Sequence, residues 1–235
     1  MQIITVQFDQ NGTERYAELL KVFRYSVKKH MPDVAFNCIT IPEPKWDEGK
    51  EKFMVKNTVK LHHWVKAVEE ATENTLIMDC DMLVIKDMSS VFDMDFDIAF
   101  TGRTLSKIPM NGGVLCIKPN ERSIEFMRLW EQVNFEMYNN KEFHNIWRHK
   151  YAGMNQASFG CTFEEGKYTT KVISIPCPEW NVCQEDWSRM SEKARCIHIK
   201  SRLRRCCIDG YKPDPKCEAA YHIWKQYQKE ANAEF

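Results

Sequence analysis

The sequence predicts an α/β fold: one domain in which a mostly parallel central sheet carries helices on both faces. Runs of aliphatic and β-branched residues alternate with amphipathic segments of helical period along most of the chain. Their spacing is that of strand–helix–strand units, which build parallel sheets. A chain of 235 residues with 43% hydrophobic and 28% charged residues has room for one full core and little room for two. We therefore expect a single domain over residues 1–235.

Strands and helices alternate in the first third of the chain. Residues 3–8 and 34–41 are rich in β-branched and apolar residues, which predicts two strands. Residues 14–30 and 55–72 carry apolar side chains at helical spacing, which predicts two amphipathic helices. Asn11-Gly12 is a turn signal between the first strand and the first helix.

The remaining elements are shorter and follow the same logic. Strands are expected at 75–78, 82–85, 97–100, 114–117, 171–175 and 195–199. Helices are expected at 120–139, 152–159 and 217–231, with residues 200–235 forming a basic loop and a terminal helix packed on the domain. Ligands of such sheets bind beyond the carboxyl ends of the strands. That rule directs attention to Asp9, Asp79, Asp81 and the loop after Phe100.

Composition narrows the class of protein. Lys plus Arg and Asp plus Glu both total 33, and this zero formal charge gives no reason to expect a nucleic-acid partner. No apolar run approaches the roughly 20 residues of a membrane span, and Met1–Val6 lacks the features of a signal peptide. We expect a soluble, cytoplasmic protein whose 10 cysteines are mostly reduced thiols.

Two carboxylates stand one residue apart in an apolar frame. Asp79 follows Leu76–Met78, and Asp81 precedes Met82–Ile85. So placed, the two charges repel each other and lose solvation unless a cation compensates them. A lone Asp-x-Asp is most often a solvated turn at a strand end, but carboxylate oxygens suit Mg²⁺ or Mn²⁺, which usually complete their shell with substrate phosphates. The apolar frame favours such a metal–diphosphate site.

Further segments, taken in chain order, form a pattern with this pair. They are Thr58–Trp64, Leu76–Val84, Asn111-Gly112-Gly113-Val114, Asn155-Gln156 and His198. The pattern resembles the glycogenin-type retaining glycosyltransferases, family eight of the GT-A fold, with their Lys-Leu-His-x-Trp helix, Asp-x-Asp strand, Asn-Ser-Gly-Val turn, Asp-Gln pair and late metal-binding His. The resemblance implies transfer of a glycosyl unit from a nucleotide-diphosphate sugar, a UDP-sugar in the first instance, to a hydroxyl acceptor with retention.

The resemblance also assigns the metal and donor sites. It implies that Asp79, Asp81 and His198 bind Mn²⁺ (or Mg²⁺), which bridges the donor's diphosphate and stabilises it as it leaves. Lys60 matches the family's Lys beside the sugar, and Cys80 lies between the two carboxylates. A solvated helix lysine and an ordinary strand histidine are the alternatives for Lys60 and His198.

The remaining donor-binding residues follow from the same match. Thr5, Val6 and Gln7 are expected to cradle the base and ribose, and Asn111-Gly112-Gly113 is expected to form a turn that lines the sugar pocket. Asn155 and Gln156 are expected to face the sugar and, with Lys60, to be the catalytic residues; the first of the pair is Asp in the family.

One segment departs from the family. After the late His, the family has Gly-x-x-Lys-Pro-Trp, whereas this chain has a basic run in Lys200–Arg205. We expect Lys200 or Arg202 to bind the diphosphate as a charge clamp; an ordinary basic surface run is the alternative.

Two other functions stay open at this point. A sugar-phosphate nucleotidyltransferase shares the fold but needs a Gly-rich phosphate loop after the first strand, where only Asn11-Gly12 and Arg15 follow. A non-catalytic binding domain stapled by zinc would use the late cysteines, of which no pair has the Cys-x₂-Cys spacing. These are Cys177, Cys183, Cys196, Cys206, Cys207 and Cys217. The acceptor, whether a glycan, a protein or a small molecule, is not encoded in readable form, because acceptor sites are built by variable loops, here 139–165 and 176–215.

Overall fold

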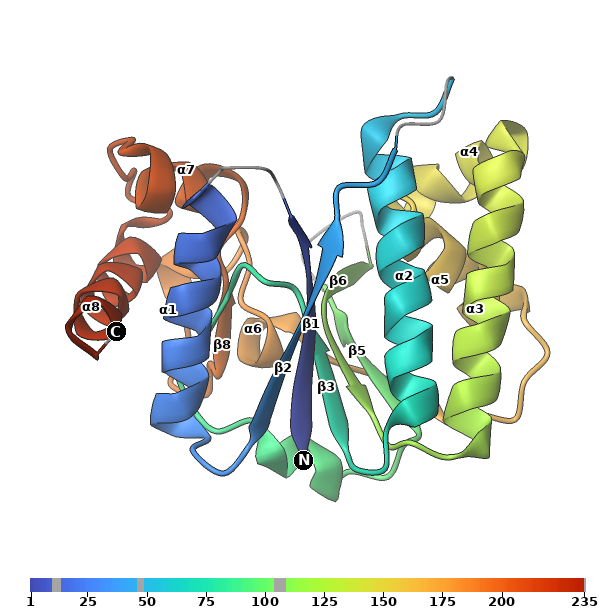
Figure 1. Cartoon of the computed structure of the whole chain (residues 1–235), viewed down its shortest axis with the longest axis horizontal. Coiled ribbons are helices and arrows are strands. Elements are labelled where there is room, and N and C mark those ends of the chain that lie inside the picture. The colour runs from blue at the N-terminus through green and yellow to red at the C-terminus, as the bar shows by residue number, and fades with distance from the viewer. Residues whose placement is uncertain (10–13, 46–48, 104–108, 235) are drawn as a thin grey trace.

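A six-stranded sheet runs through the centre of the molecule (Figure 1). The computed structural model describes residues 1–9, 14–45, 49–103 and 109–234, so the predicted Asn11-Gly12 turn lies outside the described residues. The strand order is β2-β1-β3-β6-β5-β7. The strands are β1 (Gln2–Asp9), β2 (Ala35–Pro42), β3 (Thr75–Met78), β5 (Ile98–Gly102), β6 (Met110–Ile117) and β7 (Val172–Pro176). All pairings are parallel except those of β6, which runs antiparallel to β3 and β5.

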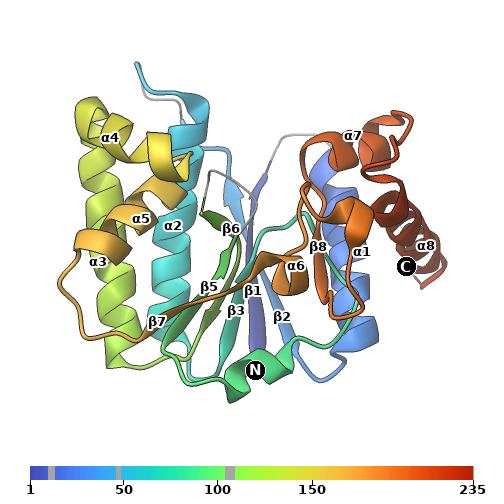
Figure 2. The same cartoon turned by 180° about the vertical axis from the view of Figure 1, so that it is seen from behind.

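Helices cover both faces of the sheet, as the sequence predicts. One face carries α2 (Lys52–Glu70), α3 (Glu121–Asn139), α4 (Lys141–Tyr151) and α5 (Asn155–Glu165). The other carries α1 (Glu14–His30), α6 (Cys177–Trp180), α7 (Ser201–Asp209) and α8 (Glu218–Glu234), which the view from behind also places on one side (Figure 2). Short 3-10 helices lie at Ser89–Asp93 and Trp187–Arg189. The fold is a single α/β domain with a mostly parallel central sheet.

The central strands are buried on both faces, which explains their continuous apolar runs. All four residues of β3 are buried. Because neighbouring side chains of a strand point to opposite faces, Ile77 packs into the core under α2 and α3, whereas Leu76 packs into the core under α1. The sequence of β3 therefore encodes a strand in the middle of the sheet.

A second, two-stranded sheet was not anticipated. The sequence predicts strands at 82–85 and 195–199; the structure places them as β4 (Met82–Val84) and β8 (Cys196–His198), which pair with each other outside the central sheet. Their antiparallel register sets Met82 opposite His198. This pairing brings the late histidine next to the end of β3.

Three predicted details are corrected. The Asn111-Gly112-Gly113 segment is part of β6 and not a turn before it. The segment after residue 200 is not a basic loop but begins with α7, whose buried Leu203, Cys206 and Cys207 recur at helical spacing. The helix expected at 152–159 is α5, which begins at Asn155 and runs further, and it is preceded by α4, which the sequence reading missed.

Helix α4 begins at a side-chain cap, because Asn140 accepts a hydrogen bond from the Phe143 amide. Its buried residues His144, Trp147 and Tyr151 share one face, so the expected loop region 139–165 is largely helical. None of the described helices combines the length and the apolar character that a membrane span requires.

Candidate active site

The two carboxylates lie in the tight connection between the two sheets. Strand β3 ends at Met78, and β4 of the small sheet begins at Met82, so Asp79-Cys80-Asp81 is the passage between them. The Asp79 amide donates to the Gly113 carbonyl of β6 (3.0 Å), which fixes the passage against the central sheet. The carboxylates thus stand at the carboxyl end of β3, where ligands of such sheets bind.

His198 joins the carboxylates through the pairing of β4 with β8. The Ile199 amide donates to the Asp81 carbonyl (2.8 Å), extending that pairing to the site. His198 Nε2 lies 3.3 Å from Asp81 Oδ1 and 3.8 Å from Asp79 Oδ2. The structure therefore brings together the three residues expected to bind the metal, with one ligand atom of each within 4.8 Å of the others.

The donor set fits a hard divalent cation. Two carboxylate oxygens and one imidazole nitrogen are ligands that Mn²⁺ and Mg²⁺ accept. The imidazole is held with Nε2 toward the carboxylates, and its buried Nδ1 has no hydrogen-bond partner in the described part of the chain. A Cβ on Gly113 would lie only 2.5 Å from His198 Cε1, so the glycine leaves room for the ring in this orientation.

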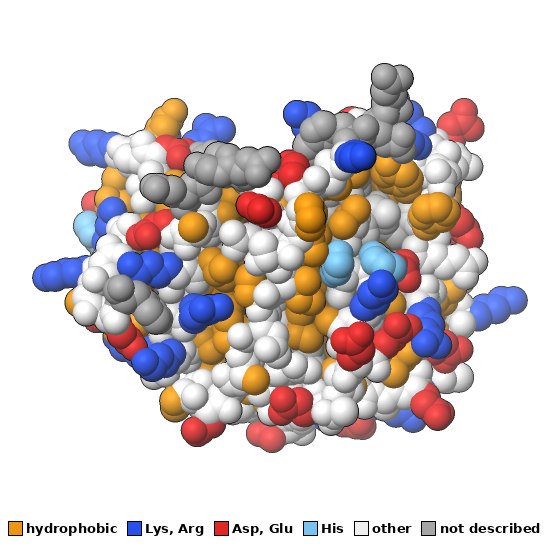
Figure 3. All heavy atoms as spheres, viewed as in Figure 1, with side chains coloured by type: hydrophobic (Ala, Val, Ile, Leu, Met, Phe, Trp, Pro, Cys, Tyr) orange, Lys and Arg blue, Asp and Glu red, His pale blue; other side chains and the backbone are white. Residues whose placement is uncertain are grey.

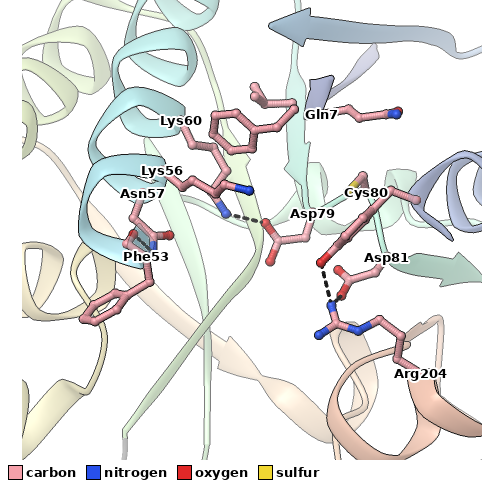
Figure 4. Close-up of a pocket in the computed structure, with 12 residues that line it drawn as sticks. Gln7, Phe53, Lys56, Asn57, Lys60, Asp79, Cys80, Asp81 and Arg204 are labelled. Atoms are coloured by element: carbon pink, nitrogen blue, oxygen red, sulfur yellow. Dashed lines mark hydrogen bonds and ion pairs between the residues drawn. The ribbon is translucent and has the colours of Figure 1, made fainter. Parts of the chain in front are cut away.

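Two cationic side chains flank the carboxylates from opposite sides (Figure 4). Lys60, from α2, donates to Asp79 Oδ1 (2.9 Å). Arg204, from α7, lies 3.4 Å from Asp81 Oδ2 and donates to the Tyr16 hydroxyl (3.0 Å). Arg204 lies at the position where Arg202 or Lys200 was expected to act.

A signal for Arg204 was present in the sequence. The family segment after the late His carries a Lys, and in this chain the basic run Lys200–Arg205 follows His198. Ser201 has φ 48°, the left-handed conformation that favours glycine. Arg204 supplies the basic group beside Asp81.

These contacts shift the acid–base properties of the site. Burial alone would raise the pKa of Asp81, but the neighbouring His198 and Arg204 outweigh burial and hold that pKa below its usual value. Burial likewise disfavours the charged form of Lys60, but the charge and hydrogen bond of Asp79 keep the pKa of Lys60 raised. Burial lowers the pKa of Lys200 and raises that of the Cys80 thiol, so Cys80 stays protonated.

Two cavities meet at the carboxylates. The first, of about 270 Å³, is formed by the end of β1, the start of α2, the Asp79-Cys80-Asp81 passage and Arg204. The second, of about 260 Å³, is formed by β6, the start of α5, His198 and two tryptophans. Asn57, Lys60 and Asp79 line both. One ligand can therefore extend from one cavity into the other past the metal-binding residues.

The first cavity receives some of the residues expected to cradle a nucleotide. Val6, Gln7 and Cys80 line it, and among the described residues the buried Oε1 atom of Gln7 has no hydrogen-bond partner. Thr5 lies in the same strand but is fully buried and is not among the residues that line the cavity. The end of β1 thus faces the cavity through Val6 and Gln7.

The second cavity gathers the residues expected around the sugar. It is lined by Asn111, Gly112, Gly113, Asn155, Gln156 and Lys200. Gln156 Nε2 donates to the Met110 carbonyl (3.1 Å) and the Tyr151 carbonyl (2.9 Å), which fixes its amide between β6 and the end of α4. Asn155 Oδ1 accepts a hydrogen bond from Asn134 (3.1 Å). These amides are held rigidly before any ligand arrives.

Arg202 lies away from both cavities. Its guanidinium donates to the Lys212 carbonyl (2.9 Å) and lies 3.7 Å from an Asp214 carboxylate oxygen, and its side chain is half-exposed. The helical turn of α7 explains the difference, because residues two apart on a helix point in different directions. Arg204, not Arg202, therefore faces the carboxylates.

The late cysteines do not form a four-ligand zinc site within the described residues. Cys177 and Cys183 approach each other with their sulfurs 3.3 Å apart. Over the described ranges, one group that contains a cysteine is compact enough to hold a metal: Cys183, Glu185 and Asp186. In that group, Glu185 is already ion-paired with Arg103.

Charges of both signs are interspersed over the face seen in Figure 3, without a broad basic field.

Comparisons with known proteins agree with the fold and give the family. A family model described as nucleotide-diphospho-sugar transferase matches residues 33–208. No curated protein matches the sequence. Solved structures of similar fold include three glycosyltransferases at 13–14% identity, and at that identity the likeness is one of fold.

Three of these structures illustrate the match. A glycosyltransferase involved in glycosylation of the major capsid of PBCV-1 is 13% identical, with 89% of this chain and 100% of that chain covered and a TM-score of 0.59. The galactosyltransferase LgtC, in complex with donor and acceptor sugar analogs, is 14% identical, with 98% and 96% covered and a TM-score of 0.60. GlyE of Streptococcus pneumoniae TIGR4 is 13% identical, with 99% and 64% covered and a TM-score of 0.55.

Proposed function

Because the chain belongs to the nucleotide-diphospho-sugar transferase family, and is thus a glycosyltransferase, we propose that it transfers a glycosyl unit from a UDP-sugar to a hydroxyl acceptor in a metal-dependent, retaining reaction. The observation that supports this proposal most directly is the meeting of Asp79, Asp81 and His198 at the junction of two cavities. A nucleotide sugar has the same two-part form, with a diphosphate between nucleoside and sugar.

In this proposal the first cavity holds the nucleoside. Gln7 lines it at the end of β1 and carries a buried amide oxygen without a partner. A uracil ring offers an N–H donor between two carbonyl acceptors, which a side-chain amide matches with one acceptor and one donor. The buried oxygen is then satisfied only in the complex, which favours binding of the base.

The diphosphate lies at the junction. Asp79, Asp81 and His198 are the residues that would hold Mn²⁺ or Mg²⁺, which when bound supplies Lewis-acid stabilisation of the departing diphosphate. Lys60 and Arg204 stand on either side of the carboxylates and are placed to donate charge-assisted hydrogen bonds to phosphate oxygens. Lys200, on the wall of the second cavity, lies on the sugar side of this junction.

The sugar occupies the second cavity. Asn155 and Gln156, with Lys60, are the proposed catalytic residues: they face the ring and hold its hydroxyl groups, while Trp64 and Trp130 form the apolar wall. Among the described residues that line this cavity, Asp79 is the sole carboxylate, and it serves the metal. We therefore propose that the acceptor hydroxyl gives its proton to the leaving diphosphate. The acceptor then attacks the sugar from the face that the diphosphate leaves, so the anomeric configuration is retained.

Two measurements test the proposal. A thermal-shift panel of UDP, GDP and ADP, each with and without Mn²⁺, should show a rise of the melting temperature with UDP and Mn²⁺ together, because a ligand that binds the native state stabilises it by mass action. UDP-sugars incubated with the enzyme should release UDP and no pyrophosphate; pyrophosphate release would instead indicate a nucleotidyltransferase. An Asp79→Ala, Asp81→Ala double variant that hydrolyses donor as fast as the parent would exclude the proposed metal site.

A further inference from the structure

The metal-binding carboxylates are already compensated by the protein's own cations. Each carboxylate directs one oxygen toward His198 Nε2: Asp79 Oδ2 at 3.8 Å and Asp81 Oδ1 at 3.3 Å. Each directs its other oxygen toward a cation: Asp79 Oδ1 toward Lys60 at 2.9 Å and Asp81 Oδ2 toward Arg204 at 3.4 Å. Each of the two carboxylates therefore has one oxygen that would face a metal and one that holds a cation.

The charges of these four groups sum to zero. Lys60 and Arg204 contribute two positive charges, and Asp79 and Asp81 contribute two negative charges. The ion pairs are partly shielded from water: 22% of the Asp79 and 10% of the Asp81 side chain is exposed, against 19% for Lys60 and 30% for Arg204. A divalent cation that enters alone leaves a net positive cluster in a poorly solvated site, which costs free energy.

A nucleoside diphosphate removes that cost. Lys60 and Arg204 both line the first cavity, from α2 and α7 on opposite faces of the sheet, so a diphosphate at the junction can contact both (Figure 4). Its phosphate oxygens can accept charge-assisted hydrogen bonds from the two cations in place of the carboxylate oxygens. Once the cations turn to the phosphates, the carboxylates present their full charge to the metal.

We propose that Lys60 and Arg204 act as internal counter-ions of the metal site, so that the divalent cation and the nucleoside diphosphate bind in a mutually dependent way. This inference rests on the proposed function and adds the order in which the site is filled: neither ligand binds tightly without the other. Linkage makes the dependence reciprocal, because the factor by which the nucleotide strengthens metal binding equals the factor by which the metal strengthens nucleotide binding.

The first experiment measures this coupling in the full chain. Free Mn²⁺ is followed by its electron paramagnetic resonance signal while the protein is titrated with and without saturating UDP. We expect Mn²⁺ to bind at least about tenfold more tightly with UDP than without it. Isothermal titration of UDP with and without Mn²⁺ should give the same factor.

Arg204→Gln supplies the decisive variant, because the inference predicts effects of opposite sign. Loss of the cation should strengthen the binding of Mn²⁺ alone by about tenfold, since the removed charge repelled the metal, and should weaken the binding of UDP in the presence of Mn²⁺. Lys60→Gln changes a different helix and should shift both affinities in the same directions. A residue that only supports the fold would weaken both.

Arg202→Gln is the matched control. It removes a cation from the same helix, but one that pairs with Asp214 and faces neither cavity. Both affinities should stay at the parent values. Thermal unfolding of each variant identifies any that fails to fold, and either Arg204→Gln or Lys60→Gln alone is sufficient for the test.

The outcomes separate this inference from the proposed function. Two results would show that the counter-ion inference is wrong while the proposed function stands, provided that the parent binds UDP with Mn²⁺. One is that the parent binds Mn²⁺ as tightly without UDP as with it. The other is that Arg204→Gln and Lys60→Gln weaken the binding of Mn²⁺ alone. If the parent binds no nucleoside diphosphate under any condition, the proposed function itself fails, and the inference with it.

Discussion

Replacing Gly113 with alanine should detach His198 from the metal site while leaving the fold in place. A Cβ at position 113 would lie 2.5 Å from His198 Cε1 and 2.6 Å from Nδ1. Carbon atoms in contact prefer about 3.5–4.0 Å, so the imidazole would have to retreat by about 1 Å. Metal–ligand distances tolerate only about 0.2 Å. The imidazole would then cease to be a ligand.

The expected magnitude follows from the loss of one of three protein ligands. Changes to groups that merely orient a ligand already weaken metal binding about 10–100-fold, so we expect Gly113→Ala to weaken Mn²⁺ binding in the presence of UDP by at least that range. The assay is the titration of free Mn²⁺ by electron paramagnetic resonance at saturating UDP, with thermal unfolding of both variants measured alongside.

Gly112→Ala is the adjacent control. Its added Cβ would meet nothing closer than Gln156 Cγ at 3.6 Å, which is an ordinary contact. Mn²⁺ affinity should therefore change little in Gly112→Ala. If Gly113→Ala bound Mn²⁺ as tightly as Gly112→Ala does, His198 could not be a metal ligand in the geometry described.

Three further changes have defined outcomes. Asp97 is buried and its pKa is held at about 2, chiefly by the hydrogen bond from Arg122. Because this folded-state pKa lies below the unfolded value of about 3.9, Asp97 stabilises the fold by about 2–3 kcal/mol above pH 4, and this stabilisation disappears as pH falls toward 2. Asp97→Asn should remove that stabilisation and its pH dependence, as measured by chemical unfolding. Asn155→Asp keeps the acceptor of the Asn134 hydrogen bond and restores the family's residue, so donor turnover should not fall; a large loss would show that the amide nitrogen itself is required. Ser201→Gly relieves a left-handed φ of 48° and should raise the melting temperature by about 2–4 °C, for about 1 kcal/mol of stabilisation; a lower melting temperature would contradict the assigned strain.

The sequence predicted the fold well because periodicity and burial are local properties. Leu76–Met78 reads as a buried strand, and Asp79 and Asp81 stand out because that apolar frame leaves two charges without a visible partner. His198 was different: an isolated histidine in a short apolar run is more often an ordinary strand residue, and only its place in the family pattern indicated a ligand. The pairing of β4 with β8 that carries it to the site is a long-range contact, which no local pattern specifies.

The residue that the sequence reading misplaced shows the limit of composition. The sequence analysis interprets Lys200–Arg205 as a basic loop and expects Lys200 or Arg202 to be the charge clamp. Folded as α7, it directs Arg204 toward Asp81 and Arg202 toward Asp214, because a helix fixes the direction of each side chain. The helical spacing of Leu203, Cys206 and Cys207 was the available signal.

The pairing of β4 with β8 also divides the chain into a scaffold and a late addition. Every strand of the central sheet lies before Cys177, whereas His198, the third proposed metal ligand, arrives only with β8. During synthesis the sheet can therefore begin to assemble while the site is still incomplete, and closing so long a loop carries an entropic penalty that must be met before the histidine docks. A cation held by Asp79, Asp81 and His198 would join the end of β3 to β8, and its release would loosen the late segment first.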